Sequence, residues 1–332
     1  MHVTMAEEEE VKTYSGLIVS IRDGLADEMA RLAERFMRLI DGISPPASTR
    51  VSPNPRRFSD KVVAAVDGGS MLIPFADASL GIASALAVIY HPEDRAFERR
   101  LLKPKILFQE PDEDEGEFMD RLDVERETMV MQLASSLLED VDVLAVDGPL
   151  IPRPKYAGEY VYQVKNLLQL AERRGRLVFG FVKRPQARFL EACLGGSGLG
   201  DRFTDRAILA ALLERFWAAP WPPMRPPAGS RGDVDVKFTY IRLLEPPTPA
   251  VFRVDVPAHL DCGEVMEVLE YVAGTADPEH GVPAMIMKAD EEVKMSRLMM
   301  VSLYRECFMK VASGIDPKYW SPLAPRWGER LW

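Results

Sequence analysis

Apolar residues recur along the chain at two spacings, which separate the predicted helices from the predicted strands. A spacing of three and four residues places side chains on one face of a helix. This spacing predicts amphipathic helices over residues 14–43, 117–139, 160–174, 205–217, 262–274 and 291–314. In the first of these helices the shared apolar face consists of Leu25, Met29, Leu32, Phe36 and Ile40.

Short, mostly apolar runs predict β-strands. These runs cover residues 62–66, 80–90, 99–108, 141–146 and 177–183, followed by a hairpin pair at 236–244 and 250–257. The run at 177–183 is almost wholly apolar, which is typical of a strand covered on both faces. The proline-rich stretch 218–233 is expected to be a loop, because proline breaks regular structure.

The order of these elements predicts an α/β protein. Three antiparallel strands come first, and helices then alternate with strands that can run parallel. The result is a mixed sheet with helices on both faces and added N- and C-terminal helices, which is the arrangement of a ribonuclease-H-like sheet. We expect an N-terminal helical segment and linker (1–55), a main domain (56–310) and an aromatic and basic C-terminal tail (311–332).

Two of the predicted strands end on the same dipeptide. The strand at 62–66 runs into Asp67 and a glycine, and the strand at 141–146 runs into Asp147 and a glycine. A helix separates the two strands, so they can be neighbours in a parallel pair, about 4.8 Å apart. Two carboxylates at such adjacent strand ends repel each other unless a cation lies between them. Oxygen ligands of this kind suit Mg²⁺ or Mn²⁺.

Asp-Gly is also a common hairpin turn, and this simpler interpretation applies to each motif alone. After the second motif, however, Pro149 and Pro152 make a tight hairpin unfavourable. The glycines at 68 and 148 would also allow backbone or substrate to approach closely.

A carboxylate metal site would need more ligands than two aspartates. Glu127 or Glu125, on the helix between the two strands, and Asp290 are candidates, and Lys183 would contact a phosphate. Two ions about 3.5–4 Å apart can activate water and stabilise the leaving oxygen of a phosphodiester. Each residue also has a simpler role: the glutamates as solvated helix charges, Asp290 as the cap of the last helix, and Lys183 as a strand-end side chain that reaches solvent.

The charge of the chain limits its partners. The net charge is −10, so nucleic acid is not attracted to the protein as a whole and would need local clusters of Lys and Arg. The expected DNA contacts are Arg56, Arg57, Lys183, Arg184 and Arg188. No apolar run reaches the roughly 18 residues of a membrane span, and the N-terminus lacks a signal-peptide pattern. We therefore expect a cytoplasmic protein with no membrane contact.

An ordered series of short motifs resembles the NurA nuclease family. The series consists of AAVDGGS at 64–70, a glutamate-bearing helix, DVLAVDGPLIP at 142–152, FGFVKRPQAR at 179–188, TYIRLL at 239–244, VFRVDVP at 251–257 and GVPAMIMKADEE at 281–292. The resemblance implies a ribonuclease-H-like fold and a homodimer. It also implies a two-metal-ion deoxyribonuclease that uses Mn²⁺, with Mg²⁺ as the alternative. Single-strand endonuclease and 5′-to-3′ exonuclease activity are expected, together with a HerA-type hexameric translocase in DNA end resection and recombinational repair.

The resemblance also implies roles for individual residues. The metal ligands would be Asp67, Glu127 (with Glu125 as the alternative), Asp147 and Asp290. Lys183 would stabilise negative charge during cleavage. The family usually has a histidine where this chain has Asp290 and a tyrosine where it has Val282; a carboxylate can still bind a metal, but it is not a neutral imidazole.

Two other functions are compatible with the sequence. The first is a NurA-like adaptor subunit that docks a motor protein and has lost much of its chemistry, which the departures at 282 and 290 suggest. The second is an actin-like ATPase or sugar kinase, which also places Asp-Gly turns at two strand ends. The second half of such proteins usually repeats the first, and this sequence has no such repeat.

Overall fold

The computed structural model describes most of the chain from residue 5 to residue 294. The described residues are 5–74, 79–153, 156, 158–191, 203–227, 234–245, 248, 250–294, 302, 303, 306, 307, 310 and 314. The predicted tail at 311–332, apart from position 314, and most of the predicted last helix lie outside them.

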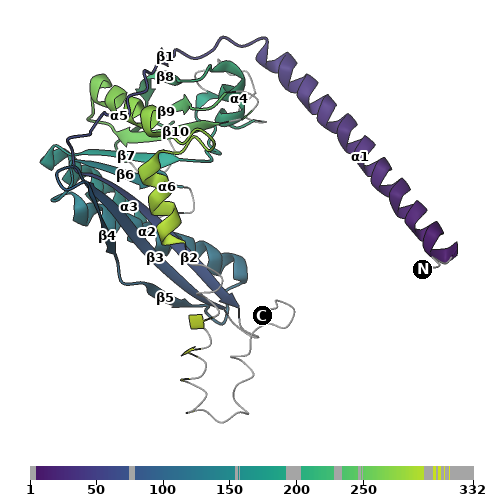
Figure 1. Cartoon of the computed structure of the whole chain (residues 1–332), viewed down its shortest axis with the longest axis horizontal. Helices are drawn as coiled ribbons and strands as arrows, with labels where there is room; N and C mark the ends of the chain where they lie inside the picture. Colours follow the sequence, from purple (N-terminus) through teal and green to yellow (C-terminus); the bar gives the residue numbers. More distant parts are fainter. Residues whose placement is uncertain are drawn as a thin grey trace.

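A single mixed sheet organises the described chain (Figure 1). The helices are α1 (Met5–Ile40), α2 (Glu115–Leu137), α3 (Glu159–Arg174), α4 (Asp205–Leu212), α5 (Cys262–Thr275) and α6 (Ala284–Val293). The strands are β1 (Thr49–Arg50), β2 (Val63–Pro74), β3 (Ser79–His91), β4 (Ala96–Leu101), β5 (Lys105–Phe108), β6 (Val143–Asp147), β7 (Leu177–Val182), β8 (Trp217–Met224), β9 (Val236–Arg242) and β10 (Val251–Pro257).

The strand order confirms the predicted mixed sheet. The order is β1-β8-β9-β10-β7-β6-β2-β3-β4, with β5 also paired to β3. Strands β2, β6 and β7 run parallel to one another, whereas β3 pairs with β2 in the antiparallel sense. Within the parallel pair β2–β6, Val63 lies opposite Val143 and Val66 lies opposite Val146. The two aspartate-bearing strands are therefore neighbours in register. Strand β6 ends on Asp147, but the predicted end of the first strand at residue 66 was wrong, because β2 continues through Asp67 to Pro74 while paired to β3.

Helices cover both faces of the central strands and create two cores. Successive residues of a strand point to opposite faces, so Ala64 and Val66 pack with residues of α2, α3 and α4. Val63 and Ala65 point the other way and pack with residues of α5 and α6. Because both faces are covered, the central strands are apolar without alternation, as expected for parallel strands.

The sequence supplies the start signal of α2. The Asp114 side chain accepts a hydrogen bond from the backbone N–H of Glu117, whose own carboxylate accepts one from the backbone N–H of Asp114. This reciprocal capping box satisfies two backbone donors that the helix leaves unpaired. Helix α2 starts at a defined residue as a result, which fixes where along β2 its polar side chains fall.

Three further predicted element boundaries were wrong. The proline-rich stretch expected to be a loop contains β8, which pairs with β9 through a register shift between Ala219 and Met224. Prolines fall within the shift, where ladder N–H groups are not required. The helix predicted at 205–217 ends at Leu212, before β8. The strand predicted at 99–108 is divided into β4 and β5 around Pro104, which has no N–H to donate.

Helix α1 confirms the first predicted helix but is largely uncovered. Leu25, Met29 and Leu32 on its apolar face are 59%, 62% and 56% exposed. Near its C-terminal end, the ring of Phe36 packs edge-on against Phe203 at 4.7 Å between centroids. Figure 1 shows the helix extending away from the sheet. Within the described residues, none of the helices combines the length and apolar content needed to cross a bilayer.

A buried ion pair ties β10 to the segment that follows β6. The Asp255 carboxylate is fully buried and accepts hydrogen bonds from the guanidinium of Arg253 at 2.7 and 2.9 Å. It also accepts from the backbone N–H groups of Leu150 and Ile151 at 3.0 and 3.3 Å. The chain immediately after Asp147 is therefore held by a charge on a strand two positions away in the sheet.

Replacing Asp255 with alanine is expected to destabilise the protein strongly. The substitution leaves a buried guanidinium and two backbone donors without their partner, so we expect a loss of about 3–5 kcal/mol in the free energy of unfolding. Urea denaturation followed by circular dichroism measures this loss. Asp235→Ala, at an exposed ion pair with Arg225, is the control and should cost less than about 1 kcal/mol. Equal costs in the two variants would contradict the structural role assigned to Asp255.

Candidate metal centre

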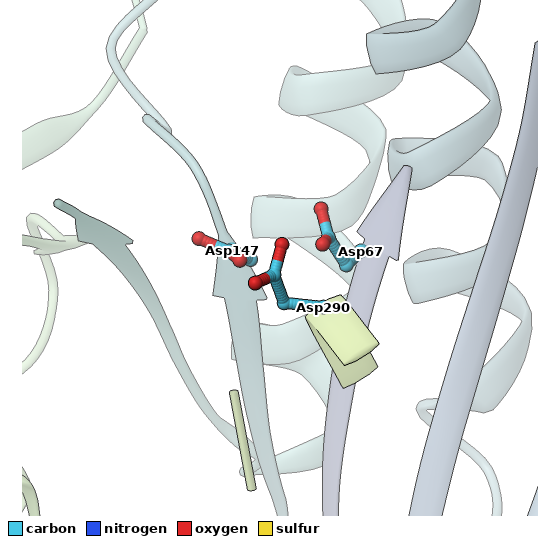
Figure 2. Close-up of side chains that lie close together, drawn as sticks. All are labelled: Asp67, Asp147 and Asp290. Carbon is cyan, nitrogen blue, oxygen red and sulfur yellow. The ribbon is translucent and has the colours of Figure 1, made fainter. Parts of the chain in front are cut away.

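Two aspartates lie side by side where the parallel pairing of β2 with β6 ends. Asp67 directly follows Val66, and Asp147, the last residue of β6, directly follows Val146, which is the partner of Val66. Both aspartates have the same strand parity as the residues that face α5 and α6. Figure 2 shows their side chains pointing toward the same space from β2 and β6. The predicted convergence is therefore present.

Asp290 adds a third carboxylate from the helix above. One oxygen from each of Asp67, Asp147 and Asp290 lies within 4.8 Å of the others. The expected simpler role of Asp290 as a helix cap was wrong, because α6 begins after Pro283 and Asp290 lies inside it. Val282, where the resemblance expects tyrosine, is buried in the core between the sheet and α5 and α6.

Two consecutive glycines after Asp67 let a helix approach from each side. A Cβ added at Gly68 would lie 2.7 Å from a methyl of Val130 on α2, and one at Gly69 would lie 2.7 Å from the backbone oxygen of Val293 on α6. Since these distances are too short for a side chain, the sequence Asp-Gly-Gly is required by close approach. The glycine at 69 allows α6 to lie close enough for Asp290 to reach the strand ends.

Lysine side chains neutralise part of this charge. The Nζ atom of Lys183, just beyond β7, lies 2.6 Å from Oδ2 of Asp147 and 3.5 Å from Oδ2 of Asp290. The Nζ atom of Lys294 donates to the same oxygen of Asp290 at 2.7 Å. Lys183, predicted from its place at a strand end, therefore contacts two of the three carboxylates.

Glu127 faces the same cavity from α2, on the other side of the sheet. Its side chain is buried, and Oε1 accepts a hydrogen bond from the guanidinium of Arg126 at 2.7 Å. It lines the cavity but is not one of the three clustered carboxylates. Glu125, the alternative ligand, instead forms an ion pair with Lys105 on β5. Of the two glutamates, Glu127 is the one placed to contribute an oxygen.

The cavity beside these carboxylates measures about 460 Å³ and is lined by charges of both signs. Four carboxylates line it: Asp67, Glu127, Asp147 and Asp290. Five cationic side chains line it too: Arg126, Arg153, Lys183, Arg184 and Lys294. Sequence reasoning missed Arg126, Arg153 and Lys294. Their positions in the sequence were the available signal. Arg126 directly precedes Glu127, Arg153 directly follows Pro152, and Lys294 lies just after the last motif.

The other predicted DNA contacts lie elsewhere. Arg56 and Arg57 line a different cavity of about 850 Å³, next to Val143 and Leu177 at the amino ends of β6 and β7. The guanidinium of Arg57 is engaged by the carboxylates of Glu267 and Glu270. Arg188 is exposed on the segment after β7, outside the lining of the acidic cavity. Of the five predicted DNA contacts, the structure brings Lys183 and Arg184 to the carboxylates.

Burial and mutual repulsion control the protonation of the aspartates. Burial, reinforced by the charge of Asp147, raises the pKa of Asp67 to about 8. Burial also raises the pKa of Asp147, and the charge of Lys183 offsets this only in part. For Asp290, burial acts upward, but the hydrogen bond from Lys294 and the charge of Lys183 outweigh it and lower the pKa. At neutral pH the protein therefore keeps a proton on Asp67 beside an ionised Asp290.

This donor set fits a divalent cation. Three carboxylate oxygens converge within 4.8 Å, and a fourth carboxylate, Glu127, borders the same cavity. Hard oxygen donors are the ligands that Mg²⁺ and Mn²⁺ prefer. A cation here would replace the proton on Asp67 and relieve the repulsion between Asp67 and Asp147.

Comparison with known proteins identifies relatives of this fold. The family model described as the NurA domain matches residues 61–295. The crystal structure of the NurA nuclease from Sulfolobus solfataricus superposes with a TM-score of 0.62 at 16% identity, covering 90% of this chain and 98% of that chain. Structures of NurA with manganese, and of NurA bound to dAMP and manganese, give TM-scores of 0.53 and 0.52 at 12% identity. They cover 87% and 85% of this chain and 97% and 94% of theirs. A search of curated protein sequences finds no match.

The raised pKa of Asp67 predicts a specific dependence of stability on pH. Between the unfolded value of 3.8 and the folded value of about 8, the folded protein binds more protons than the unfolded chain, so stability falls as pH rises. Asp67→Asn removes this titration. In buffer with a metal chelator, we expect the variant to melt at a higher temperature than the native protein at pH 8 and at a similar temperature near pH 4.

Thermal melting across this pH range, with and without Mn²⁺, checks the expectation. Adding Mn²⁺ at pH 8 should raise the melting temperature of the native protein more than that of Asp67→Asn. If the melting temperatures of the two proteins changed with pH in the same way, the pKa of Asp67 would not be raised in the folded protein.

Proposed function

The chain belongs to the NurA family, and from this premise we propose that it is a two-metal-ion deoxyribonuclease that hydrolyses phosphodiester bonds. The observation that carries the proposal is the convergence of Asp67, Asp147 and Asp290 where the in-register pairing of β2 with β6 ends. The family match also disfavours the actin-like alternative, for which the sequence has no internal repeat.

The residues that would hold the ions are Asp67, Asp147 and Asp290, with Glu127 reaching them from α2. Manganese is the proposed ion, with Mg²⁺ as the alternative, because the site offers only oxygen donors and two structures of similar fold contain manganese. Bound there, the ions would stabilise negative charge on the phosphodiester and lower the pKa of the attacking water.

The chain's own residues would prepare the site for the substrate. Asp67 releases its proton when a cation binds, since a ligating carboxylate must be ionised. Lys183, already 2.6 Å from Asp147, places a positive charge next to the position of the reacting phosphate. Fixed charge of this kind stabilises the developing negative charge without reorganisation. Lys294 holds the Asp290 carboxylate in place through its hydrogen bond.

The finer parts of the function rest on family membership. We propose single-strand endonuclease and 5′-to-3′ exonuclease activity, with DNA entering beside Lys183 and Arg184, which line the cavity. We also propose a homodimer that acts with a HerA-type hexameric translocase in DNA end resection and recombinational repair in the cytoplasm. Arg56 and Arg57 would serve a DNA path only if the strand extended to the opposite end of the sheet.

An adaptor without strong nuclease activity is the second candidate, because Asp290 and Val282 stand where the family usually has histidine and tyrosine. A cleavage assay with Mn²⁺ on the native protein and on Asp67→Ala separates the two. Cleavage by the native protein that is lost in Asp67→Ala supports the nuclease. No cleavage by either protein supports the adaptor.

Asp147→Asn is expected to abolish metal-dependent cleavage without disturbing the fold. The amide keeps the shape of the side chain but removes the charge that a cation requires, so cleavage of single-stranded DNA should fall at least about a hundredfold. Asp235→Asn, an exposed acidic position on the surface, is the matched control and should cleave normally. Circular dichroism verifies the fold of both variants. Cleavage at the native rate by Asp147→Asn would reject the site.

A further inference from the structure

The Arg126 side chain lines the carboxylate cavity with an incomplete set of partners. Its Nη2 atom donates to Oε1 of Glu127 at 2.7 Å and lies 3.7 Å from Oδ1 of Asp123. Its Nε atom is buried and has no hydrogen-bond partner. A buried donor left unpaired is costly, so the position of this guanidinium is not explained by its contacts within the protein.

The fold nevertheless makes room for this arginine. A Cβ added at Gly68 would lie 2.8 Å from Cγ and 3.3 Å from Cδ of Arg126. The glycine that directly follows Asp67 therefore allows the arginine stem to pass over β2 and reach the cavity. The Arg126 side chain is 24% exposed, which leaves part of it open to a ligand in that space.

The charge around Arg126 favours an anion with several oxygens. Glu127 and Asp123 raise the pKa of Arg126, although burial acts in the opposite direction, so the guanidinium stays charged. The cationic side chains that line the cavity already outnumber its carboxylates, and a divalent ion would add to this excess of positive charge. A planar guanidinium matches two oxygens of one phosphate at once, which an ammonium group does not.

Glu127 is the hydrogen-bond acceptor that Arg126 would exchange for another. Its carboxylate lines the same cavity as the three clustered aspartates and accepts a hydrogen bond from Arg126. If Glu127 turned toward a cation, the Nη2 donor of Arg126 would lose this acceptor. The edge of the guanidinium formed by Nε and Nη2 would then be available to a ligand.

We propose that Arg126 binds the DNA phosphate at this site, exchanging the Glu127 carboxylate for non-bridging phosphate oxygens. This role deepens the proposed nuclease function and rests on it. Arg126 on α2 and Lys183 beyond β7 would then hold one phosphate from two different elements of the fold.

Binding of a fluorescent single-stranded oligonucleotide, with Ca²⁺ in place of Mn²⁺ to slow turnover, tests the proposal. For Arg126→Gln we expect about tenfold weaker binding, and the slope of log affinity against log salt should shrink by about 0.7, the value for one lost phosphate contact on a single strand. Arg225→Gln, an exposed arginine paired with Asp235, is the control and should keep the native slope.

Titration calorimetry with Mn²⁺ alone separates phosphate binding from a structural role. Because Arg126 competes with the cation for Glu127, we expect Arg126→Gln to bind Mn²⁺ at least as tightly as the native protein. Weaker Mn²⁺ binding with an unchanged salt slope would make Arg126 a positioning residue for Glu127 and overturn the proposal. An unchanged salt slope and unchanged affinity for the oligonucleotide would overturn it too.

A second variant covers the case in which Arg126→Gln fails to fold. Arg126→Lys keeps the charge, so its salt slope should match that of the native protein while its affinity is several-fold lower, because one ammonium cannot replace the two-pronged contact. Native affinity in Arg126→Lys would overturn the proposed two-oxygen contact. These measurements do not depend on cleavage, so a native protein that fails to cut DNA would refute the nuclease function separately.

Discussion

Electrostatic repulsion among three carboxylates determines how charged side chains are placed where the pairing of β2 with β6 ends. The oxygens of Asp67, Asp147 and Asp290 converge within 4.8 Å, where burial weakens the screening that water would provide. The protein limits the repulsion in two ways: it keeps a proton on Asp67, and it places the ammonium groups of Lys183 and Lys294 against the other two. A divalent cation can replace both the proton and the ammonium groups. This replacement is the physical basis of the proposed metal chemistry.

The sheet and its two helix layers hold these charges together. Parallel pairing of β2 with β6 fixes the two aspartates in register, and no loop flexibility intervenes. The glycines at 68 and 69 then admit α2 from one face and α6 from the other. As a result, Arg126 and Glu127 reach the site from α2 on one face of the sheet, and Asp290 reaches it from α6 on the other face.

The polar groups of this region are supported at some distance from the cavity. Asp255, buried on β10, holds the backbone after Asp147 through the N–H groups of Leu150 and Ile151. Buried charges of this kind contribute little net stability, but removing one partner is costly. The site is thus a place where the fold accepts unfavourable electrostatics, as functional sites commonly do.

The sequence alone determined that β2 and β6 are parallel neighbours and that an aspartate follows the apolar run of each. Apolar runs of strand length separated by a helical pattern require a parallel pair, and parallel pairing brings the carboxyl ends to one edge. Strand parity also follows from the sequence, because side chains alternate between faces. The strands, the aspartates and the side-chain parity depend on residues close together in the chain, which local periodicity can predict, and the pairing of the two strands follows from the rule for parallel connections.

Only the tertiary structure decided which distant side chains complete the site. Glu125 and Glu127 are two residues apart, and packing of α2 against β2 sends one to Lys105 and the other to the cavity. Asp290 reaches the strand ends because α6 begins early and approaches Gly69 closely. Strand β8 formed from a proline-rich stretch because a register shift removed the need for its N–H groups. These outcomes depend on contacts between segments far apart in the chain, and such contacts leave no periodic trace in the sequence.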